Sequence, residues 1–285
     1  MTRRAIHWLV LALLLSATRA SMAQPTFLGF DRNDYPGDAA LPTLRRSFLY
    51  TSYWLNNPPG ESANTWVGKR ALLKRYGFGF LVLFNGRMDA ELQDKDAAKA
   101  GAADGQAAVV AALREGFARN VRIFLDQEEG GRLLPEQAAY IFAWIDAVRA
   151  AGTRAGVYCS GIQVRDESGL ISTAADIAQR EKSRERQSAQ RDHARLALWI
   201  ANDACPPAPG CTLQTPAMAD AFPEDVRRYA TVWQYAQSPR RMEFSAGCPK
   251  NAASDGNCYP PGLPRGANSF VDLDAASLAD PSEAP

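Results

Sequence analysis

The most informative stretch of the sequence is Arg122-Ile123-Phe124-Leu125-Asp126-Gln127-Glu128, which joins an apolar run directly to two carboxylates. Short continuous apolar runs rich in Ile, Leu and Phe are typical of strands that are buried on both faces, as in parallel sheets. Asp126 and Glu128 are two residues apart, so an extended strand presents both side chains on one face. The stretch therefore predicts a buried strand that ends in an acidic site.

Similar short apolar segments recur along the chain. Together with this stretch there are eight, and the other seven are Phe27–Asp31, Ser47–Trp54, Phe78–Asn85, Arg154–Ser160, Leu196–Ala201, Thr231–Ala236 and Phe270–Asp274. Helical patterns lie between several of them, at Ala97–Arg119, Pro135–Ala151 and Asp176–Arg195. Eight strands that alternate with helices predict an α/β fold, a single-domain (β/α)8 barrel of the TIM type. An open doubly wound sheet is the alternative.

The first residues have the pattern of an export signal. Arg3 and Arg4 precede the apolar run Trp8–Leu15, and small residues around Ala23 offer a cleavage site. We therefore expect residues 1–23 to be a signal peptide, residues 24–280 to form the barrel domain, and the protein to be periplasmic or secreted. A short uncleaved anchor is the alternative. No second long apolar run follows, so we expect no stable membrane insertion.

Charge and loop composition argue against nucleic acid and nucleotides. The chain has 32 Lys and Arg, three of them within residues 1–23, which leaves 29 against 31 Asp and Glu. A nearly balanced, slightly acidic domain lacks the basic face that nucleic acid favours. No glycine-rich phosphate loop follows a predicted strand, so we expect no nucleotide cofactor.

The cysteines fit an oxidising compartment. Cys205 and Cys211 could close one small loop as a disulfide, and Cys248 and Cys258 another, within long loops rich in Pro and Gly. Cys159 lies in an apolar segment, which predicts a buried free thiol.

Histidine is scarce, which limits the possible chemistry. Only His193 remains outside the export signal, so a zinc or other metal site is not expected. For the same reason, we do not expect a Ser-His-Asp hydrolase, which needs a positioned imidazole.

Acidic residues fall at the ends of several predicted strands. Asp31 ends the first, Asp126 and Glu128 end the fourth, and Asp272 lies within the last. The carboxyl ends of parallel barrel strands share one rim, so these four should converge. Crowded carboxylates acquire separated pKa values, which glycoside cleavage requires of its proton donor and its charge-stabilising partner. The alternative is structural: acids at strand ends often cap helices, and Arg132 follows closely enough to neutralise one.

Side chains suited to sugars lie near the same strand ends. Aromatic rings can stack on the apolar faces of sugars, and a Gln amide can bind hydroxyl groups. The candidate substrate-binding residues are Tyr53, Tyr158, Trp199, Trp233, Gln234 and Tyr235. The alternative is that some of these aromatics only fill the end of the barrel.

An ordered set of motifs resembles glycoside hydrolase family 25, the lysozyme-like muramidases. The motifs are Gly29-Phe30-Asp31, Asp126-x-Glu128, Gly156-Val157-Tyr158, Leu198-Trp199-Ile200-Ala201, Trp233-Gln234-Tyr235 and Val271-Asp272-Leu273. A glycoside-hydrolase-like group of unassigned function is similar to the chain over further motifs. These are Tyr35-Pro36-Gly37, Trp66-x-Gly68-Lys69-Arg70 and Phe124–Gly131.

The resemblance to family 25 implies cleavage of β-1,4 bonds in peptidoglycan or a related polysaccharide. It implies that Glu128 is the general acid, that Asp126 assists, and that Asp31 and Asp272 complete the acidic rim. Because the second group has no assigned chemistry, a non-catalytic glycan-binding or cell-envelope module is the alternative. A third hypothesis is a hydrolase of another envelope bond in which the acids hold a metal.

Overall fold

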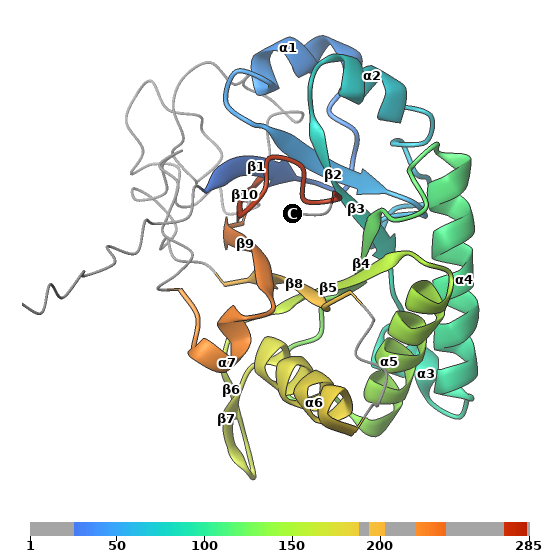
Figure 1. The fold of residues 1–285 in the computed structure, drawn as a ribbon, viewed down its shortest axis with the longest axis vertical. Helices are drawn as coiled ribbons and strands as arrows, with labels where there is room; N and C mark the ends of the chain where they lie inside the picture. The colour runs from blue at the N-terminus through green and yellow to red at the C-terminus, as the bar shows by residue number, and fades with distance from the viewer. Residues whose placement is uncertain (1–25, 188–193, 203–220, 238–270, 284–285) are drawn as a thin grey trace, which may run out of the picture.

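The computed structural model describes residues 26–187, 194–202, 221–237 and 271–283. Eight strands form a closed barrel in the order β1-β10-β9-β8-β5-β4-β3-β2 (Figure 1). They are β1 Phe27–Asp31, β2 Tyr50–Trp54, β3 Gly79–Asn85, β4 Arg122–Gln127, β5 Arg154–Ser160, β8 Ala197–Ala201, β9 Ala230–Ala236 and β10 Asp272–Ala276. Each lies within or overlaps one of the eight predicted segments. The predicted closed α/β barrel is confirmed.

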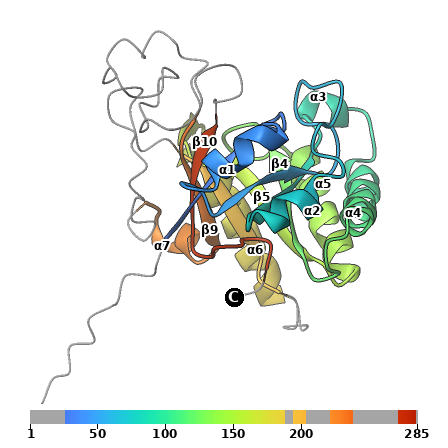
Figure 2. The same cartoon turned by 90° about the horizontal axis from the view of Figure 1, so that it is seen from above.

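Helices cover the outside of the barrel. The longer ones are α4 Ala97–Arg114, α5 Pro135–Ala150 and α6 Thr173–Gln187, and the short ones are α1 Leu41–Leu44, α2 Arg70–Arg75, α3 Asp89–Leu92, α7 Glu224–Arg227 and the 3-10 turn Asp38–Ala40. Helices α4 and α5 pack side by side against the strands (Figure 1 and Figure 2). Helix α5 begins at Pro135, as the sequence predicts, because proline suits the first turn of a helix. A small hairpin, β6 Val164–Asp166 and β7 Gly169–Ile171, was not predicted.

One strand departs from the all-parallel arrangement that the sequence suggested. Strand β10 runs antiparallel to both β1 and β9, whereas the other neighbouring pairs of the barrel are parallel. Asp272 therefore reaches the rim because it starts β10, and not because it lies near the end of a parallel strand. Its Cα partner across the seam is Asp31, the last residue of β1.

Glycines make room for aromatic side chains inside the barrel. A Cβ added to Gly156 would lie 2.4 Å from the Phe124 ring, and one added to Gly29 would lie 2.0 Å from the Tyr50 ring. Phe124 and Tyr50 are fully buried. The interior below the rim is therefore a packed core, as is usual for barrels of this size.

The end of the barrel opposite the acidic rim is closed by the segment after β10. Arg122 donates a hydrogen bond from Nη1 to the Pro281 carbonyl at 3.0 Å, and Arg154 donates one from Nη2 to the Ser282 carbonyl at 2.7 Å. The Asp280 carboxylate accepts from the Phe80 amide at 3.0 Å. Polar groups at the starts of the strands therefore bind the segment after β10.

Several expectations fall outside the described residues. The predicted signal peptide, residues 1–23, lies outside the described residues, and so do both predicted disulfides, Cys205 with Cys211 and Cys248 with Cys258. Cys159 is a buried free thiol, as predicted, and its burial raises the pKa of the thiol. Within the described ranges, no helix combines the length and apolar character needed to cross a bilayer.

A Gly156→Ala substitution is expected to destabilise the fold by about 1–3 kcal/mol, the usual cost of overpacking a core. The added methyl group would overlap the Phe124 ring, and the backbone of β5 would have to shift. Gly130→Ala is the matched control, since its Cβ would meet nothing closer than 3.8 Å. Chemical unfolding of both variants measures the difference. Equal stability of the two would contradict the packing argument.

Candidate active site

The acidic residues of three strands converge at one end of the barrel. Asp31 ends β1 opposite Asp272, and Asp126 lies near the end of β4, in register with Tyr158 on β5. Burial is the largest cause of the raised pKa values of Asp31 and Asp126; the charge of Glu128 raises both further, and the charge of Asp31 adds to the shift of Asp126. The four acids that the sequence singled out therefore lie close enough to interact.

A buried glutamine connects the two sides of this cluster. The Tyr158 hydroxyl donates to Gln234 Oε1 at 2.9 Å, and Gln234 Nε2 donates to Asp31 Oδ2 at 2.8 Å. A longer contact of 3.5 Å runs from Gln234 Nε2 to Asp272 Oδ2. Gln234 is 1% exposed, so these bonds form away from bulk water. They fix the orientation of the Asp31 carboxyl.

Asp274 is a fifth acid of the cluster, and the sequence analysis missed it. It is fully buried, accepts a hydrogen bond from Trp199 Nε1 at 2.9 Å, and hydrogen-bonds to Asp31. Burial and the neighbouring Asp31 charge raise its pKa well above the ordinary range. The signal was present, because Asp272-x-Asp274 repeats the two-residue spacing of Asp126-x-Glu128.

Asp31 and Asp274 form a coupled pair that shares a buried environment. Burial raises the pKa of Asp31 to about 6, against hydrogen bonds from Gln234 and Asp274 that lower it; the charge of Glu128 raises it further. When one of two carboxyls this close is ionised, its negative charge raises the free energy needed to ionise the other. Asp274 therefore holds the proton and Asp31 carries the charge first as the pH rises.

Asp126 has no hydrogen-bond partner within the described part of the chain. Both of its carboxylate oxygens are buried and unpaired, and the residue is 4% exposed. Burial, followed by the charges of Glu128 and Asp31, raises its pKa well above the usual value. A buried polar group without a partner costs stability, and such groups concentrate at functional sites.

Glu128 lies just beyond the last residue of β4, and its side chain is exposed at the rim. Partial desolvation raises its pKa. Arg132 does not neutralise it, because Arg132 Nε pairs with Asp166 Oδ2 at 2.7 Å and Arg132 Nη1 lies 3.8 Å from Asp176. The alternative in which Arg132 pairs with an acid of the site is therefore not supported.

The adjacent Glu129 has a structural role. Its Oε2 atom accepts hydrogen bonds from the Asp89 amide at 2.9 Å and from Gln137 Nε2 at 2.5 Å. These bonds connect the end of β4 to helices α3 and α5. The two neighbouring glutamates thus differ in environment: Glu128 faces the rim, and Glu129 holds helices α3 and α5.

Two of the predicted aromatic residues lie at the acidic cluster. The Tyr158 and Trp199 rings are 4.7 Å apart between centroids, and each donates a hydrogen bond into the cluster. Trp199 is buried and also packs on Phe124. Of the two, only Tyr158 retains partial exposure from which a ligand could be contacted.

The remaining aromatic candidates are buried elsewhere. The Tyr53 hydroxyl donates to Glu115 Oε2 at 2.5 Å, and its ring packs 5.2 Å from that of Phe117. Trp233 donates from Nε1 to the Asn202 carbonyl at 2.8 Å, and its ring lies 6.0 Å from that of Tyr235. The structure does not bring Tyr53 or Trp233 to the acidic cluster, and Tyr235 is buried beside Trp233.

No group of three or more His, Cys, Asp or Glu side chains in the described ranges is arranged to hold a metal ion. Within the cluster, the carboxyls of Asp31 and Asp274 are held by hydrogen bonds to Gln234, to Trp199 and to each other.

Solved structures with a similar fold have low sequence identity. An uncharacterized protein of B. stearothermophilus has a TM-score of 0.53 at 18% identity, over 88% of this chain and 95% of its own. The Tat-secreted protein Rv2525c of Mycobacterium tuberculosis has a TM-score of 0.50 at 11% identity, over 90% and 96%. A family 25 glycosyl hydrolase from Bacillus anthracis scores 0.46 at 11% identity, over 88% of both chains. Among curated proteins, none matches this sequence.

A closed α/β barrel with carboxyls gathered at one rim is an arrangement that glycoside hydrolases use. The family model described as Rv2525c-like, glycoside hydrolase-like domain matches residues 63–237, more than half of the chain. The chain belongs to this family. The resemblance to a glycoside-hydrolase-like group is therefore confirmed.

The raised pKa of Asp31 predicts that stability falls as the pH rises. Between its ordinary value of 3.8 and its folded value of about 6, the folded state binds more protons than the unfolded state. The contribution of Asp31 to the free energy of unfolding, at most about 3 kcal/mol, is fully present below pH 3.8 and is lost as the pH rises through about 6. The raised pKa values of Asp126 and Asp274 also make the protein less stable as the pH rises.

Unfolding free energies measured from about pH 4 to pH 7 should decrease less in Asp31→Asn than in the unmodified protein. The matched control is Asp34→Asn, which alters an exposed residue on the loop after β1. An Asp31→Asn profile identical to that of the unmodified protein would contradict the burial of an ionisable Asp31.

Proposed function

We propose that the chain is an exported glycoside hydrolase that cleaves peptidoglycan or a related polysaccharide, with Glu128 as proton donor. The observation that carries the proposal is the position of Glu128. It is exposed at the rim, its pKa is raised, and it lies close to buried carboxyls. A proton donor must remain protonated near the working pH and must reach the leaving oxygen.

The buried acids supply the second requirement of glycoside cleavage. As the glycosidic bond breaks, positive charge develops on the sugar, and carboxylates fixed close to it stabilise that charge. Asp31 is the acid best prepared for this role, because Gln234 and Asp274 hydrogen-bond to it and favour its ionised form. Asp126 has free acceptor atoms that can orient a substrate amide or hydroxyl. Asp272 extends the acidic rim beside Asp31.

The family supports a glycan as substrate and the first residues support export. The family description is that of a glycoside hydrolase-like domain. Its namesake Rv2525c is described as Tat-secreted, and residues 1–23 of this chain have the basic and apolar pattern of an export signal. Tyr158 offers an aromatic surface next to the acids on which a sugar can stack.

Glu128→Gln is expected to reduce the release of reducing ends from purified cell walls by roughly 10²–10⁴-fold, the usual contribution of general acid catalysis. The amide cannot donate a proton to the leaving oxygen, and its shape preserves the fold. Glu136→Gln, an exposed change in the first turn of α5, is the matched control and should retain full activity.

Equal activity of Glu128→Gln and the unmodified protein would remove Glu128 from the mechanism. Wall fragments bound but left uncut by the unmodified protein from about pH 4 to pH 8 would favour the glycan-binding module instead.

A further inference from the structure

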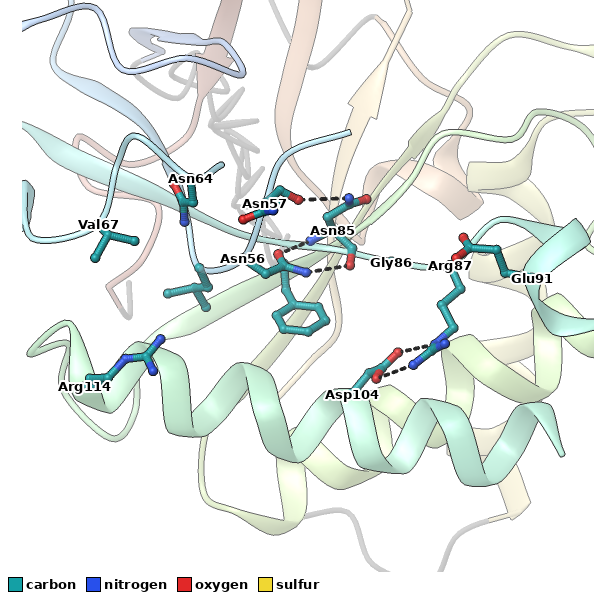
Figure 3. Close-up of a pocket in the computed structure, with 12 residues that line it drawn as sticks. Asn56, Asn57, Asn64, Val67, Asn85, Gly86, Arg87, Glu91, Asp104 and Arg114 are labelled. Carbon is teal, nitrogen blue, oxygen red and sulfur yellow. Dashed lines mark hydrogen bonds and ion pairs between the residues drawn. The ribbon is translucent and has the colours of Figure 1, made fainter. Parts of the chain in front are cut away.

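A groove of about 580 Å³ lies beside the acidic site, and glycoside cleavage alone does not account for it (Figure 3). The loops after β2 and β3 and one side of α4 form its walls. Asn85 and Gly86 belong to its lining, and both contact β4: Asn85 is in register with Asp126, and the Gly86 amide donates to the Asp126 carbonyl at 3.2 Å. The groove therefore begins one strand away from the acidic cluster.

The groove follows α4 away from this point. Asp104 and Arg114 both line it and are ten residues apart on the same helix, a rise of about 15 Å. An extended peptide advances about 3.3 Å per residue, so roughly four residues span this distance. The groove is thus long enough for a short linear ligand that extends from the acidic site along α4.

The inner part of the groove is lined by asparagine side chains with fixed orientations (Figure 3). Asn56 exchanges two hydrogen bonds with the Asn85 backbone, at 2.7 and 3.0 Å, and Asn85 Nδ2 donates to the Asn57 carbonyl at 3.0 Å. The Asn64 amide donates to the Trp54 carbonyl and accepts from the Trp66 backbone amide.

Two of these side chains keep acceptor atoms available. The Oδ1 atoms of Asn57 and Asn85 accept no hydrogen bond from any described residue. Because the amides are already fixed, they can receive the N–H groups of a peptide at little cost in side-chain entropy.

The charges of the groove are distributed unevenly. Arg87 is neutralised by Asp104 through two bonds, of 2.6 and 3.0 Å. Arg114 is exposed and has no acidic partner among the described residues. The far end of the groove therefore presents an unpaired guanidinium, the group best suited to bind a carboxylate. Val67, on the same side of the groove as Arg114 (Figure 3), is 53% exposed and adds an apolar wall suited to small aliphatic side chains.

We propose that this groove binds a short peptide arm with a free carboxylate, carried by the glycan whose backbone lies at the acidic site. Asparagine amides bind the peptide backbone, and Arg114 binds the carboxylate. The substrate class is thus a peptide-substituted glycan, and not a bare polysaccharide. The source of the arm rests on the proposed function, whereas peptide binding by the groove is independent of it.

Peptide binding is tested with two N-acetylated, alanine-containing tetrapeptides that differ only in a free or an amidated C-terminus. The unmodified protein should bind the free acid about fivefold more tightly in calorimetry, as expected for one exposed ion pair. Arg114→Gln should abolish this preference. Arg75→Gln, which changes an exposed residue at the end of α2 outside the groove, should retain it.

Three results would overturn the proposal: no binding of either peptide, equal binding of both by the unmodified protein, or the same loss of preference in Arg75→Gln. Because these peptides contain no glycosidic bond, failure of the proposed glycosidase activity does not affect this measurement.

Kinetics on wall glycan strands, with and without their peptide arms, test the link to cleavage. Arg114→Gln should raise KM about fivefold for the peptide-bearing strands at unchanged kcat, and should leave the peptide-free strands unaffected. An equal effect on both substrates would overturn the proposal. Strands of both kinds left uncut by the unmodified protein would contradict the proposed function, and the tetrapeptide measurement would still decide whether the groove binds peptide.

Discussion

The acidic site depends on the pairing of β10 with both of its neighbours. This strand closes the barrel by running antiparallel to β1 and β9, and its register sets Asp272 opposite Asp31 and Asp274 opposite Gln234. A shift of register by one residue would turn these side chains to the other face of the sheet. An irregularity between Leu273 and Asp274 adjusts the pairing at the place where the carboxyls meet. One seam thus positions three of the five acids.

The acidic end of the barrel places ionisable groups where they reduce stability. Asp31, Asp126 and Asp274 are all buried, and burial is the largest cause of the raised pKa of each. The barrel tolerates this because the layer beneath is well packed, with Phe124, Trp199 and Tyr50 fully buried. Local costs at a functional site, offset by packing elsewhere, are a common pattern in enzymes.

The sequence predicts the barrel well because the information needed is local. Each apolar segment marks a strand by composition, and Pro135 marks a helix start. The direction of β10 is not local, because the same residues can pair either way. Contacts with residues from other segments decide where the Tyr53 and Trp233 side chains lie. Their position near strand ends in the sequence therefore did not show that they point away from the acidic cluster.

Asp274 was detectable by its spacing from Asp272, whereas its burial was not. The polar groove could not be foreseen for a different reason. Its walls come from the loops after β2 and β3 and from α4, and only the fold brings these segments together.

Closure of the barrel by β10 also constrains the order of folding. Strand β1 is synthesised before the other strands of the barrel, and its antiparallel partner spans residues 272–276. Until those residues emerge, one edge of β1 has exposed amide and carbonyl groups that can pair with other chains. The contact is among the longest-range in the molecule, and such contacts slow folding. Protection of that open edge during synthesis is therefore a requirement that this topology places on the cell.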